Sequence, residues 1–312
     1  MARRALLLGI HGGASTSIAI LSDDTAVVQA RREGAPMSVN GPGFDNIARA
    51  LFILITRCCE DARCKPPELS AIVVGIAGLE REEDPVRLRD ALNALFAKSG
   101  SRPPPVTFEA DARITLEGAF DGAEGVVVVA GSGSIVIGKT PRGQVVSVGG
   151  WGAILGDEGG GYFIGREALI AVSLECEKRG SAGRLREVFG ERFHFDSREH
   201  ILSAIYQQKF DIASLAPVVM ETAANNDVVS QRILDRAALL LADQARIVVM
   251  QMGLLRKVKL VMAGSLVDRE TVYSNALHMK LLKVLPQVEI RRPLHEPAHG
   301  AVLMAIAQLK KA

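Results

Sequence analysis

The sequence predicts an α/β protein with two domains, and two observations lead to this prediction. Strands alternate with helices along much of the chain, a pattern typical of sheets buried between helices. In addition, a unit of three strands occurs twice, over residues 6–33 and 125–150. A repeat of this kind indicates a duplicated domain. The length of 312 residues leaves room for two hydrophobic cores.

Each copy of the repeat contains its own turn signals. The first copy reads LLLGIHGGASTSIAILSDDTAVVQARRE and the second reads GVVVVAGSGSIVIGKTPRGQVVSVGG. In both, an apolar strand meets a turn of small residues and a second strand follows. Polar residues at 22–24 and 141–143 predict the hairpin that leads into the third strand.

The elements after each copy follow from hydrophobic periodicity and chain breakers. After the first copy we expect helices at 44–61, 83–98 and 112–119 and strands at 71–78 and 105–111. After the second copy the chain is mainly helical from about 162 to 256, with loops near 180 and 194 and one long helix at 227–252. The expected end of the chain is a strand at 257–266, a helix at 270–283, a strand at 287–290 and a helix at 297–310.

The composition is that of a globular protein without a nucleic-acid surface. Hydrophobic residues make up 48% and charged residues 23%, and the formal net charge is +2. Arginine pairs at 3–4, 31–32 and 291–292 are scattered and are interpreted as solvated surface charge. The apolar run at 5–10 is too short for a signal peptide or a membrane span, so we expect a cytoplasmic protein.

Four cysteines are present, namely Cys58, Cys59, Cys64 and Cys176. None of them forms a CxxC pair. We interpret them as buried or incidental thiols in a reducing compartment rather than as a disulfide or metal framework.

Two turns of small residues are candidates for phosphate binding. GGASTS at 12–17 and GSGS at 131–134 each join two strands of a repeat. Backbone N–H groups in such turns can hold an anion, and glycine lets a phosphate approach the chain closely. For either turn alone, a simple hairpin is the alternative. Neither turn has the GxxxxGK[ST] pattern of a P-loop, and neither has the strand-to-helix context of a dinucleotide-binding fingerprint.

Three further stretches allow both a structural and a functional interpretation. The loop GGWGAILGDEGGGYFIGREAL at 149–169 contains the only tryptophan, and its acidic pair at 157–158 is either a helix cap or a set of sugar contacts. Asp111, in FEADAR at the end of a strand, is either a helix N-cap or a general base, since α/β proteins place catalytic groups at the carboxyl ends of strands. MAGSLV at 262–267 is another strand-to-turn junction, which is uninformative by itself.

Together these motifs resemble the superfamily of sugar kinases, hexokinases, actin and heat-shock ATPases. Within it the chain is similar to the group that holds N-acetylglucosamine kinases, glucosamine kinases and the BadF/BadG/BcrA/BcrD ATPases. The resemblance covers essentially the whole chain and is most specific over 131–169. It implies two ribonuclease H-like (actin-like ATPase) domains with a central cleft, each on a β-β-β-α-β-α-β-α plan. The implied N-terminal domain is 1–112 plus 295–312, and the C-terminal domain is 113–294 with a helical insertion.

The resemblance also implies a function and a set of site residues. It implies an ATP-dependent kinase for an amino sugar such as N-acetylglucosamine or glucosamine, with Asp111 as the base that deprotonates the sugar hydroxyl. The implied sugar contacts are Asn40, Gly150, Trp151 and Asp157. The implied ATP contacts are Gly12, Gly13, Ser15, Thr16, Gly131, Ser132, Gly133, Ser134, Gly264 and Ser265. The implied cofactors are ATP and Mg²⁺, and the implied small-molecule partners are the sugar and ATP. Relatives often dimerise, so a homodimer stays open.

The first turn departs from the pattern of this group. The group usually has DGGGTKT where this chain has HGGASTS, so His11 replaces an aspartate that organises Mg²⁺ and Thr16 replaces a lysine. Ala263 likewise stands where a glycine is common. Imidazole is a poor ligand for Mg²⁺, which prefers oxygen, so no metal-binding residue is assigned.

Two alternatives to a kinase stay open at this point. A degraded first turn is also typical of a sugar-binding pseudokinase that acts as a sensor. An activating ATPase of a radical acyl-CoA enzyme would need an iron–sulfur cluster bound by correctly placed cysteines, and the four cysteines lie outside any such motif.

Overall fold

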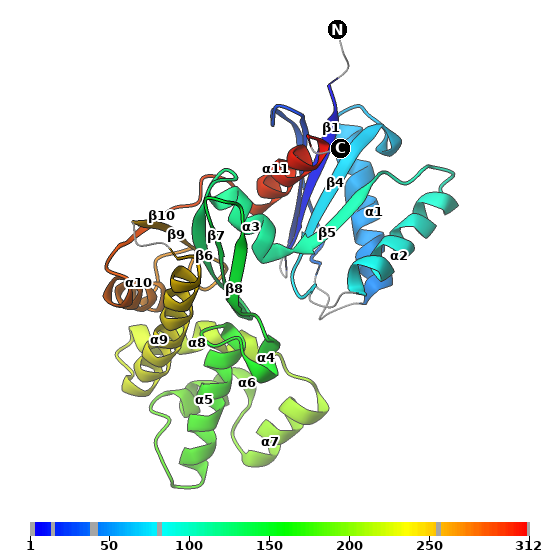
Figure 1. Ribbon diagram of the computed structural model, residues 1–312. Coiled ribbons are helices and arrows are strands. Elements are labelled where there is room, and N and C mark those ends of the chain that lie inside the picture. The colour runs from blue at the N-terminus through cyan, green and yellow to red at the C-terminus, as the bar shows by residue number, and fades with distance from the viewer. Residues whose placement is uncertain (1–3, 14–15, 38–42, 80–82, 254–256, 311–312) are drawn as a thin grey trace. The chain divides into compact units, whose positions relative to one another are not determined.

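The computed structural model describes residues 4–13, 16–37, 43–79, 83–253 and 257–310. The expected contacts Ser15 and Asn40 therefore lie outside the described residues. The chain divides into two compact units (Figure 1). Unit 1 comprises Met1–Glu124 and Arg292–Ala312, and unit 2 comprises Gly125–Arg291.

Unit 1 is a five-stranded mixed sheet covered by helices. Its strands are β1 (Leu6–Gly12), β2 (Ser17–Asp23), β3 (Val28–Gly34), β4 (Leu69–Ile76) and β5 (Val106–Ala110). Its helices are α1 (Phe44–Asp61), the 3₁₀ turn η1 (Pro66–Glu68), α2 (Asp84–Lys98), α3 (Asp111–Ala119) and α11 (Pro297–Leu309). The strand order is β3-β2-β1-β4-β5, with β1, β4 and β5 parallel and β1, β2 and β3 antiparallel.

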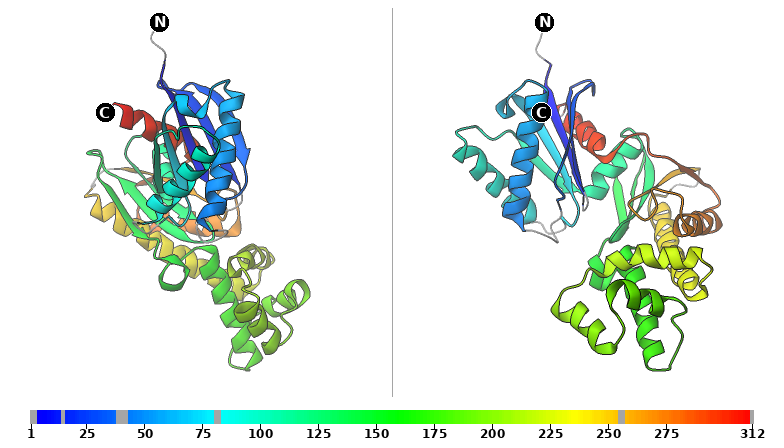
Figure 2. Two further views of the ribbon diagram at one scale, coloured as in Figure 1. Left: turned by 90° about the vertical axis from the view of Figure 1, so that its right-hand side faces the viewer. Right: turned by 180° about the vertical axis from the view of Figure 1, so that it is seen from behind.

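Helices bury both faces of this sheet. Residues of α1 and α2 form one core with the strands, and residues of α11 form smaller cores with β1, β2 and β4 (Figures 1 and 2). The helix α11 lies so close to β1 that a side-chain carbon at Gly9 would collide with the backbone of Ala298 and Val302. This close fit explains why residues from the end of the chain belong to the first unit.

The helix α3 also belongs to unit 1. Ile114 is fully buried and fills the space above Gly75, where a larger residue would collide with it. Gly118 and Gly300 let α3 and α11 approach each other closely. The expected domain boundary at residue 112 falls at the start of α3. In the structure the contacts of α3 place this helix in unit 1, which continues to Glu124.

Unit 2 repeats the sheet of unit 1 and adds a group of helices. Its strands are β6 (Gly125–Ala130), β7 (Ser134–Lys139), β8 (Val145–Gly149), β9 (Val258–Ala263) and β10 (Val288–Arg291). Its helices are α4 (Gly152–Leu155), α5 (Gly161–Cys176), α6 (Leu185–Phe193), α7 (Arg198–Leu202), η2 (Ser203–Gln207), η3 (Ile212–Leu215), α8 (Ala216–Ala224), α9 (Val228–Gln251) and α10 (Val272–Val284). The strand order, β10-β9-β6-β7-β8, matches that of unit 1 element for element.

The duplicated α/β plan expected from the sequence is therefore confirmed. The order β-β-β-α-β-α-β-α describes unit 1 directly, and in unit 2 the helices from α4 to α9 are inserted before β9. Figure 2 shows the group from α5 to α8 set away from the strands of the same unit. Most expected elements lie within two residues of the observed ones; for example, α1 has the expected bounds.

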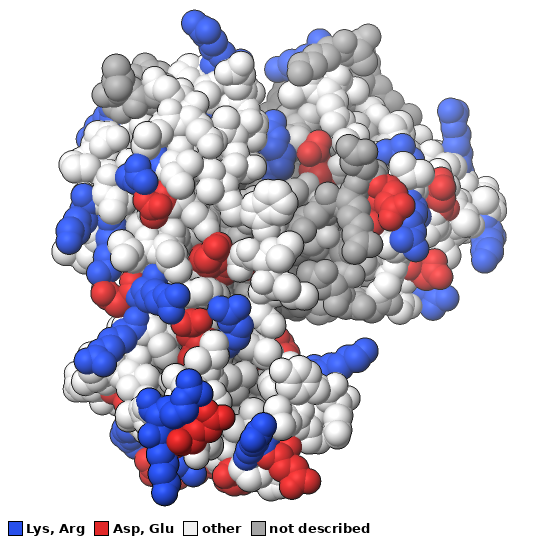
Figure 3. Space-filling model, turned by 60° about the horizontal axis from the view of Figure 1, so that its bottom comes forward, with Lys and Arg blue, Asp and Glu red and all other residues white. Residues whose placement is uncertain are grey.

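Surface charge and hydropathy agree with the composition. On the face shown in Figure 3, Lys and Arg are interspersed with Asp and Glu rather than gathered into a field of one sign. Among the described residues, none of the helices combines the length and the apolar character needed to cross a membrane.

Candidate active site

The carboxyl edge of the unit 1 sheet brings three strand ends together. In the register of β1, β4 and β5, His11 pairs with Gly75 and Gly75 pairs with Glu109. One step further, the partners are Gly12, Ile76 and Ala110. Asp111 follows Ala110 directly, so the side chains at the ends of β1 and β5 share one edge of the sheet. Gly75 of β4 is the residue that lies between His11 and Glu109 across the three strands.

Asp111 is the first residue of α3 rather than its N-cap. The cap residue is Ala110, whose extended backbone carries the chain from the strand into the helix. The Asp111 carboxylate accepts a hydrogen bond from the Ala112 N–H at 2.7 Å, which fixes one of its oxygens. Burial raises the pKa of Asp111, and the neighbouring charge of His11 partly opposes that rise. This edge therefore holds a partly buried carboxylate of raised proton affinity beside an imidazole.

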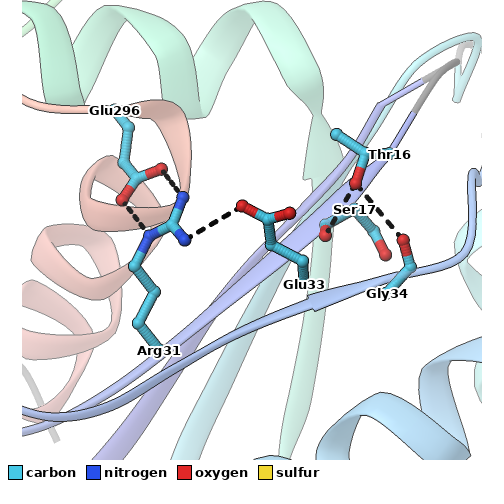
Figure 4. A network of polar contacts seen from close by, with 6 residues as sticks. All are labelled: Thr16, Ser17, Arg31, Glu33, Gly34 and Glu296. Carbon is cyan, nitrogen blue, oxygen red and sulfur yellow. Dashed lines mark hydrogen bonds and ion pairs between the residues drawn. The ribbon is translucent and has the colours of Figure 1, made fainter.

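The first small-residue turn lies at the same edge, and its described residues are held by backbone hydrogen bonds. The Gly13 N–H donates to the Thr16 carbonyl at 3.1 Å, and the Met37 N–H donates to the Gly13 carbonyl at 2.9 Å. The His11 ring lies against Gly13, since a side-chain carbon there would be 3.3 Å from Cε1 of the imidazole. Figure 4 shows the Thr16 hydroxyl directed at the Gly34 carbonyl, to which it donates at 3.3 Å.

The second small-residue turn, between β6 and β7, accepts hydrogen bonds from the start of α5, the helix that follows the glycine-rich loop. The N–H of Gly161 donates to the Gly131 carbonyl at 2.8 Å, and the N–H of Tyr162 donates to the Ser132 carbonyl at 2.9 Å. These bonds satisfy the first N–H groups of α5, a task that capping side chains often perform. Neither acidic residue of the loop caps α5, whose N-cap is Gly160 without a side-chain hydrogen bond.

Asp157 instead joins the glycine-rich loop to this turn. Its carboxylate accepts hydrogen bonds from the backbone N–H groups of Ser134 and Gly152, although burial has the larger effect and raises its pKa. Gly133 leaves room for that carboxylate, because a side-chain carbon there would collide with it. The backbone of Asp157 adopts the left-handed conformation, with a φ of 55°. The structure thus gives this expected sugar contact a positioning role in the loop.

The other expected sugar contacts in unit 2 lie just before Asp157. Gly150 has a φ of 72° and donates its N–H to the Ser134 carbonyl at 3.1 Å. The Trp151 side chain is 73% exposed, and Ile154 and Leu155 are also exposed. Within unit 2, an open indole beside a glycine-rich loop is suited to packing against the apolar face of a sugar ring.

The MAGSL turn after β9 lies next to the second small-residue turn. β6 and β9 are parallel neighbours, and the Leu266 N–H donates to the Ala130 carbonyl at 3.1 Å. Gly264, with φ of 108°, donates its N–H to the Asp268 carboxylate at 2.7 Å. Ser265 is exposed and lies beside Gly131. The expected ATP contacts of unit 2 therefore gather at one edge of its sheet.

Two of these relationships were not expected from the sequence. The proximity of His11 to Asp111 depends on which strands are neighbours. The signal for it is that β1 and β5 end in small residues, Gly12 and Ala110, and that β4 leads directly into Ala77 and Gly78. The hydrogen bond from the Gly264 N–H to the Asp268 carboxylate closes a five-residue turn. Asp268 lies one residue beyond the MAGSLV motif, so the motif does not reveal this bond.

The described cysteines form no disulfide, and the buried ones have little thiolate character. Burial raises the pKa of Cys58 to about 11 and also raises that of Cys59. Cluster ligation needs thiolates. The thiols of α1 are therefore poor cluster ligands.

Comparisons with known proteins agree with this geometry. The model of the BadF/BadG/BcrA/BcrD ATPase family matches residues 8–305. The chain is 32% identical to an N-acetylmuramic acid/N-acetylglucosamine kinase of Clostridium acetobutylicum, over 96% of this chain and 97% of the relative. It is 27% identical to an N-acetyl-D-glucosamine kinase of Dictyostelium discoideum, over 98% of this chain and 99% of the relative. Its fold is similar to a crystal structure titled as an N-acetylglucosamine kinase from Chromobacterium violaceum, with a TM-score of 0.77, 22% identity and coverage of 97% and 99% of the two chains.

Proposed function

This chain belongs to the BadF/BadG/BcrA/BcrD ATPase family, and on that premise we propose that it is an ATP-dependent kinase that phosphorylates a hydroxyl of an amino sugar. N-Acetylglucosamine and N-acetylmuramic acid are the first candidate substrates, because two relatives matched over nearly their whole length are named as kinases of these sugars. The observation that carries the proposal is Asp111, a partly buried carboxylate at the carboxyl end of β5 whose pKa is raised.

Asp111 is proposed to act as the general base. A sugar hydroxyl is a poor nucleophile, so a carboxylate within hydrogen-bond reach must accept its proton as the oxygen attacks phosphorus. The hydrogen bond from the Ala112 N–H fixes the orientation of this carboxylate. The raised pKa of Asp111 makes its carboxylate a stronger acceptor for the hydroxyl proton.

The two small-residue turns and the MAGSL turn are proposed to hold ATP. Gly131 supports this assignment, because a side-chain carbon there would meet, among the described residues, a single neighbour within 4 Å, the Ser265 hydroxyl. Trp151 and Gly150 are proposed to contact the sugar, with Asp157 holding the loop that presents them. Asn40 and Ser15 remain part of the proposal from sequence alone.

The donor set of unit 1 fits Mg²⁺ with one protein carboxylate. Mg²⁺ usually keeps several waters and binds through one or two carboxylates plus substrate phosphates, so Asp111 would hold it through a coordinated water and keep its carboxylate for the hydroxyl proton. His11, in place of a second carboxylate, does not suit that ion. When bound with ATP, Mg²⁺ would neutralise charge on the transferred phosphoryl group.

A sugar-binding sensor without kinase activity is the second candidate. It is favoured by the first turn, where a threonine stands in place of the lysine usual in this group and the Thr16 hydroxyl donates to the Gly34 carbonyl. Calorimetry separates the two functions. A sensor binds an amino sugar and fails to bind ATP, whereas a kinase binds both.

The test of the proposed function is ADP release from ATP and Mg²⁺ with a panel of sugars. The panel should contain N-acetylglucosamine, N-acetylmuramic acid, glucosamine and glucose at millimolar concentration. We expect sugar-dependent release with at least one amino sugar and little with glucose. A rate that does not change when any of these sugars is added would sink the proposal.

A further inference from the structure

Outside the proposed active site, three metal-ligating side chains of unit 1 converge. Asp121 lies two residues beyond α3, His295 lies just before α11, and His299 lies in the first turn of α11. One ligand atom from each residue lies within 4.8 Å of the other two. His295 Nε2 is 3.5 Å from Asp121 Oδ1, and the two imidazole rings are stacked with centroids 4.1 Å apart.

Backbone hydrogen bonds hold this convergence in place. The Leu294 N–H donates to the Ala119 carbonyl and the His295 N–H donates to the Gly118 carbonyl, both at 3.1 Å. The segment that enters α11 is thereby tied to the last turn of α3. The Gly122 N–H donates to the Glu117 carbonyl at 2.9 Å, and this tight turn orients Asp121, whose φ is 52°. The three side chains thus come from segments whose backbones are fixed to one another.

Glu296, which lies between the two histidines in sequence, has a different partner. Arg31 of β3 donates to both of its carboxylate oxygens, at 2.9 and 3.1 Å (Figure 4). The Glu296 carbonyl in turn accepts the His299 N–H at 3.0 Å. The fork from Arg31 therefore anchors the start of α11 and leaves Asp121 as the carboxylate that faces the histidines.

The donor set is that of a transition-metal site. Neutral imidazole suits zinc, copper, iron and nickel, and carboxylate suits the same ions when imidazole is present. Tetrahedral zinc, with ligands at about 2.0–2.2 Å, needs ligand atoms roughly 3.4 Å apart, close to the observed separation of His295 Nε2 and Asp121 Oδ1.

We propose that Asp121, His295 and His299 bind a divalent transition-metal ion of the zinc class, with water completing the coordination. The side chains of Asp121 and His295 are 57% and 38% exposed, so solvent reaches the position that the ion would take. Asp121 comes three residues before the chain leaves unit 1 at Glu124, and His295 comes three residues after it returns at Arg292. The ion would join these two segments, and it is independent of the Mg²⁺ that accompanies ATP.

The test uses the full chain, freed of metal with a chelator, without nucleotide. Calorimetry with Zn²⁺ should give one site per chain, and Co²⁺ should give visible ligand-field bands without the near-ultraviolet band of a cobalt–thiolate bond. His295→Gln, His299→Gln and Asp121→Asn should each weaken the affinity for Zn²⁺ by at least about tenfold. Zn²⁺ should also raise the melting temperature of the wild type more than that of the variants at the same Zn²⁺ concentration.

His200→Gln is the matched control. His200 lies 3.9 Å from Asp196 on the surface and, among the described residues, belongs to no three-ligand cluster. This variant should bind Zn²⁺ as the wild type does. Metal-free melting curves show whether each variant is folded. Equal Zn²⁺ affinity in the wild type and in folded His295→Gln and His299→Gln, or a cobalt–thiolate band that accounts for all the metal bound, would overturn the proposal.

Discussion

The imidazole of His11 opposes the effect of burial on the Asp111 carboxylate. Burial raises the pKa of Asp111, and the His11 charge lowers it. His11 is the penultimate residue of β1 and Asp111 follows β5, with β4 between those two strands. In a proposed kinase whose first turn lacks the usual aspartate, the base and the substituted residue are thus electrostatic neighbours.

Asp111→Asn should lower kcat about a hundred- to ten-thousandfold, because an amide cannot accept the hydroxyl proton. Sugar affinity, measured by calorimetry, should change little, since the amide keeps the size and the hydrogen-bonding ability of the carboxylate. Glu109→Gln is the matched control, a half-buried carboxylate two residues earlier whose pKa burial also raises. A variant Asp111→Asn that keeps more than a tenth of wild-type turnover would rule Asp111 out as the base.

The same substitution should stabilise the protein at neutral pH. The pKa of Asp111 is higher in the folded state than in the unfolded state, so folding favours the protonated carboxyl group. The free energy of unfolding therefore falls as the pH rises from the pKa of the unfolded state through the pKa of the folded state. Asp111→Asn removes that loss. We therefore expect a higher melting temperature for the variant at pH 7 and a smaller difference below pH 4. A variant that melts lower at pH 7 would contradict this sign.

His11→Asp should restore a second oxygen ligand for Mg²⁺. We expect turnover to rise and the rate to depend more strongly on Mg²⁺. The added negative charge also raises the pKa of Asp111, so the acid limb of the pH–rate profile should move to higher pH. The opposing hypothesis is that protonated His11 stabilises the phosphates. A wild type that needs no divalent metal and loses activity above pH 7, with an inactive His11→Asp, would favour that hypothesis.

Asp157→Ala should affect the turn as well as the sugar. It removes a charged acceptor from the N–H groups of Ser134 and Gly152, at a cost of about 1.5–3 kcal/mol. We expect a lower melting temperature and higher KM values for both ATP and sugar. Asp157→Asn, which keeps an acceptor and tolerates the left-handed backbone, should be milder. An unchanged KM for ATP in Asp157→Ala would contradict this and would mean that Asp157 acts only in sugar binding.

Two glycines of the second turn should respond differently to alanine. Gly131→Ala meets only the Ser265 hydroxyl, at 3.8 Å, so the fold should tolerate it while the KM for ATP rises. Gly133→Ala collides with the Asp157 carboxylate and should destabilise the protein by about 1–3 kcal/mol. Thermal melts and ATP titrations of both variants test this contrast. Unchanged ATP kinetics in Gly131→Ala would remove that residue from the phosphate site.

Local sequence patterns were enough to predict the alternation of strands and helices, whereas the candidate site residues came from the resemblance to a known family and stay predictions. Periodicity gave the bounds of α1, and the small-residue turns were visible within short windows. Contacts between distant residues were not predictable in this way. The crossing of α3 and α11 depends on Gly118 and Gly300, and neither glycine signals its partner.

The same limit explains what the sequence did not reveal about the site. Asp157 was predicted as a sugar contact because its neighbours suggest one, but its bond to Ser134 requires the loop to fold back onto β7. The spacing of His295 and His299 was present in the sequence, whereas their convergence with Asp121 needs the packing of α11 on α3.

The most direct test of the proposed kinase is identification of the product. The wild type and Asp111→Asn should each be incubated with ATP, Mg²⁺ and N-acetylglucosamine or N-acetylmuramic acid, and the mixtures analysed by ³¹P NMR. The account predicts a sugar phosphate ester in stoichiometric amount with ADP for the wild type and almost none for the variant. Inorganic phosphate as the only new signal, or equal amounts of ester from both proteins, would contradict it.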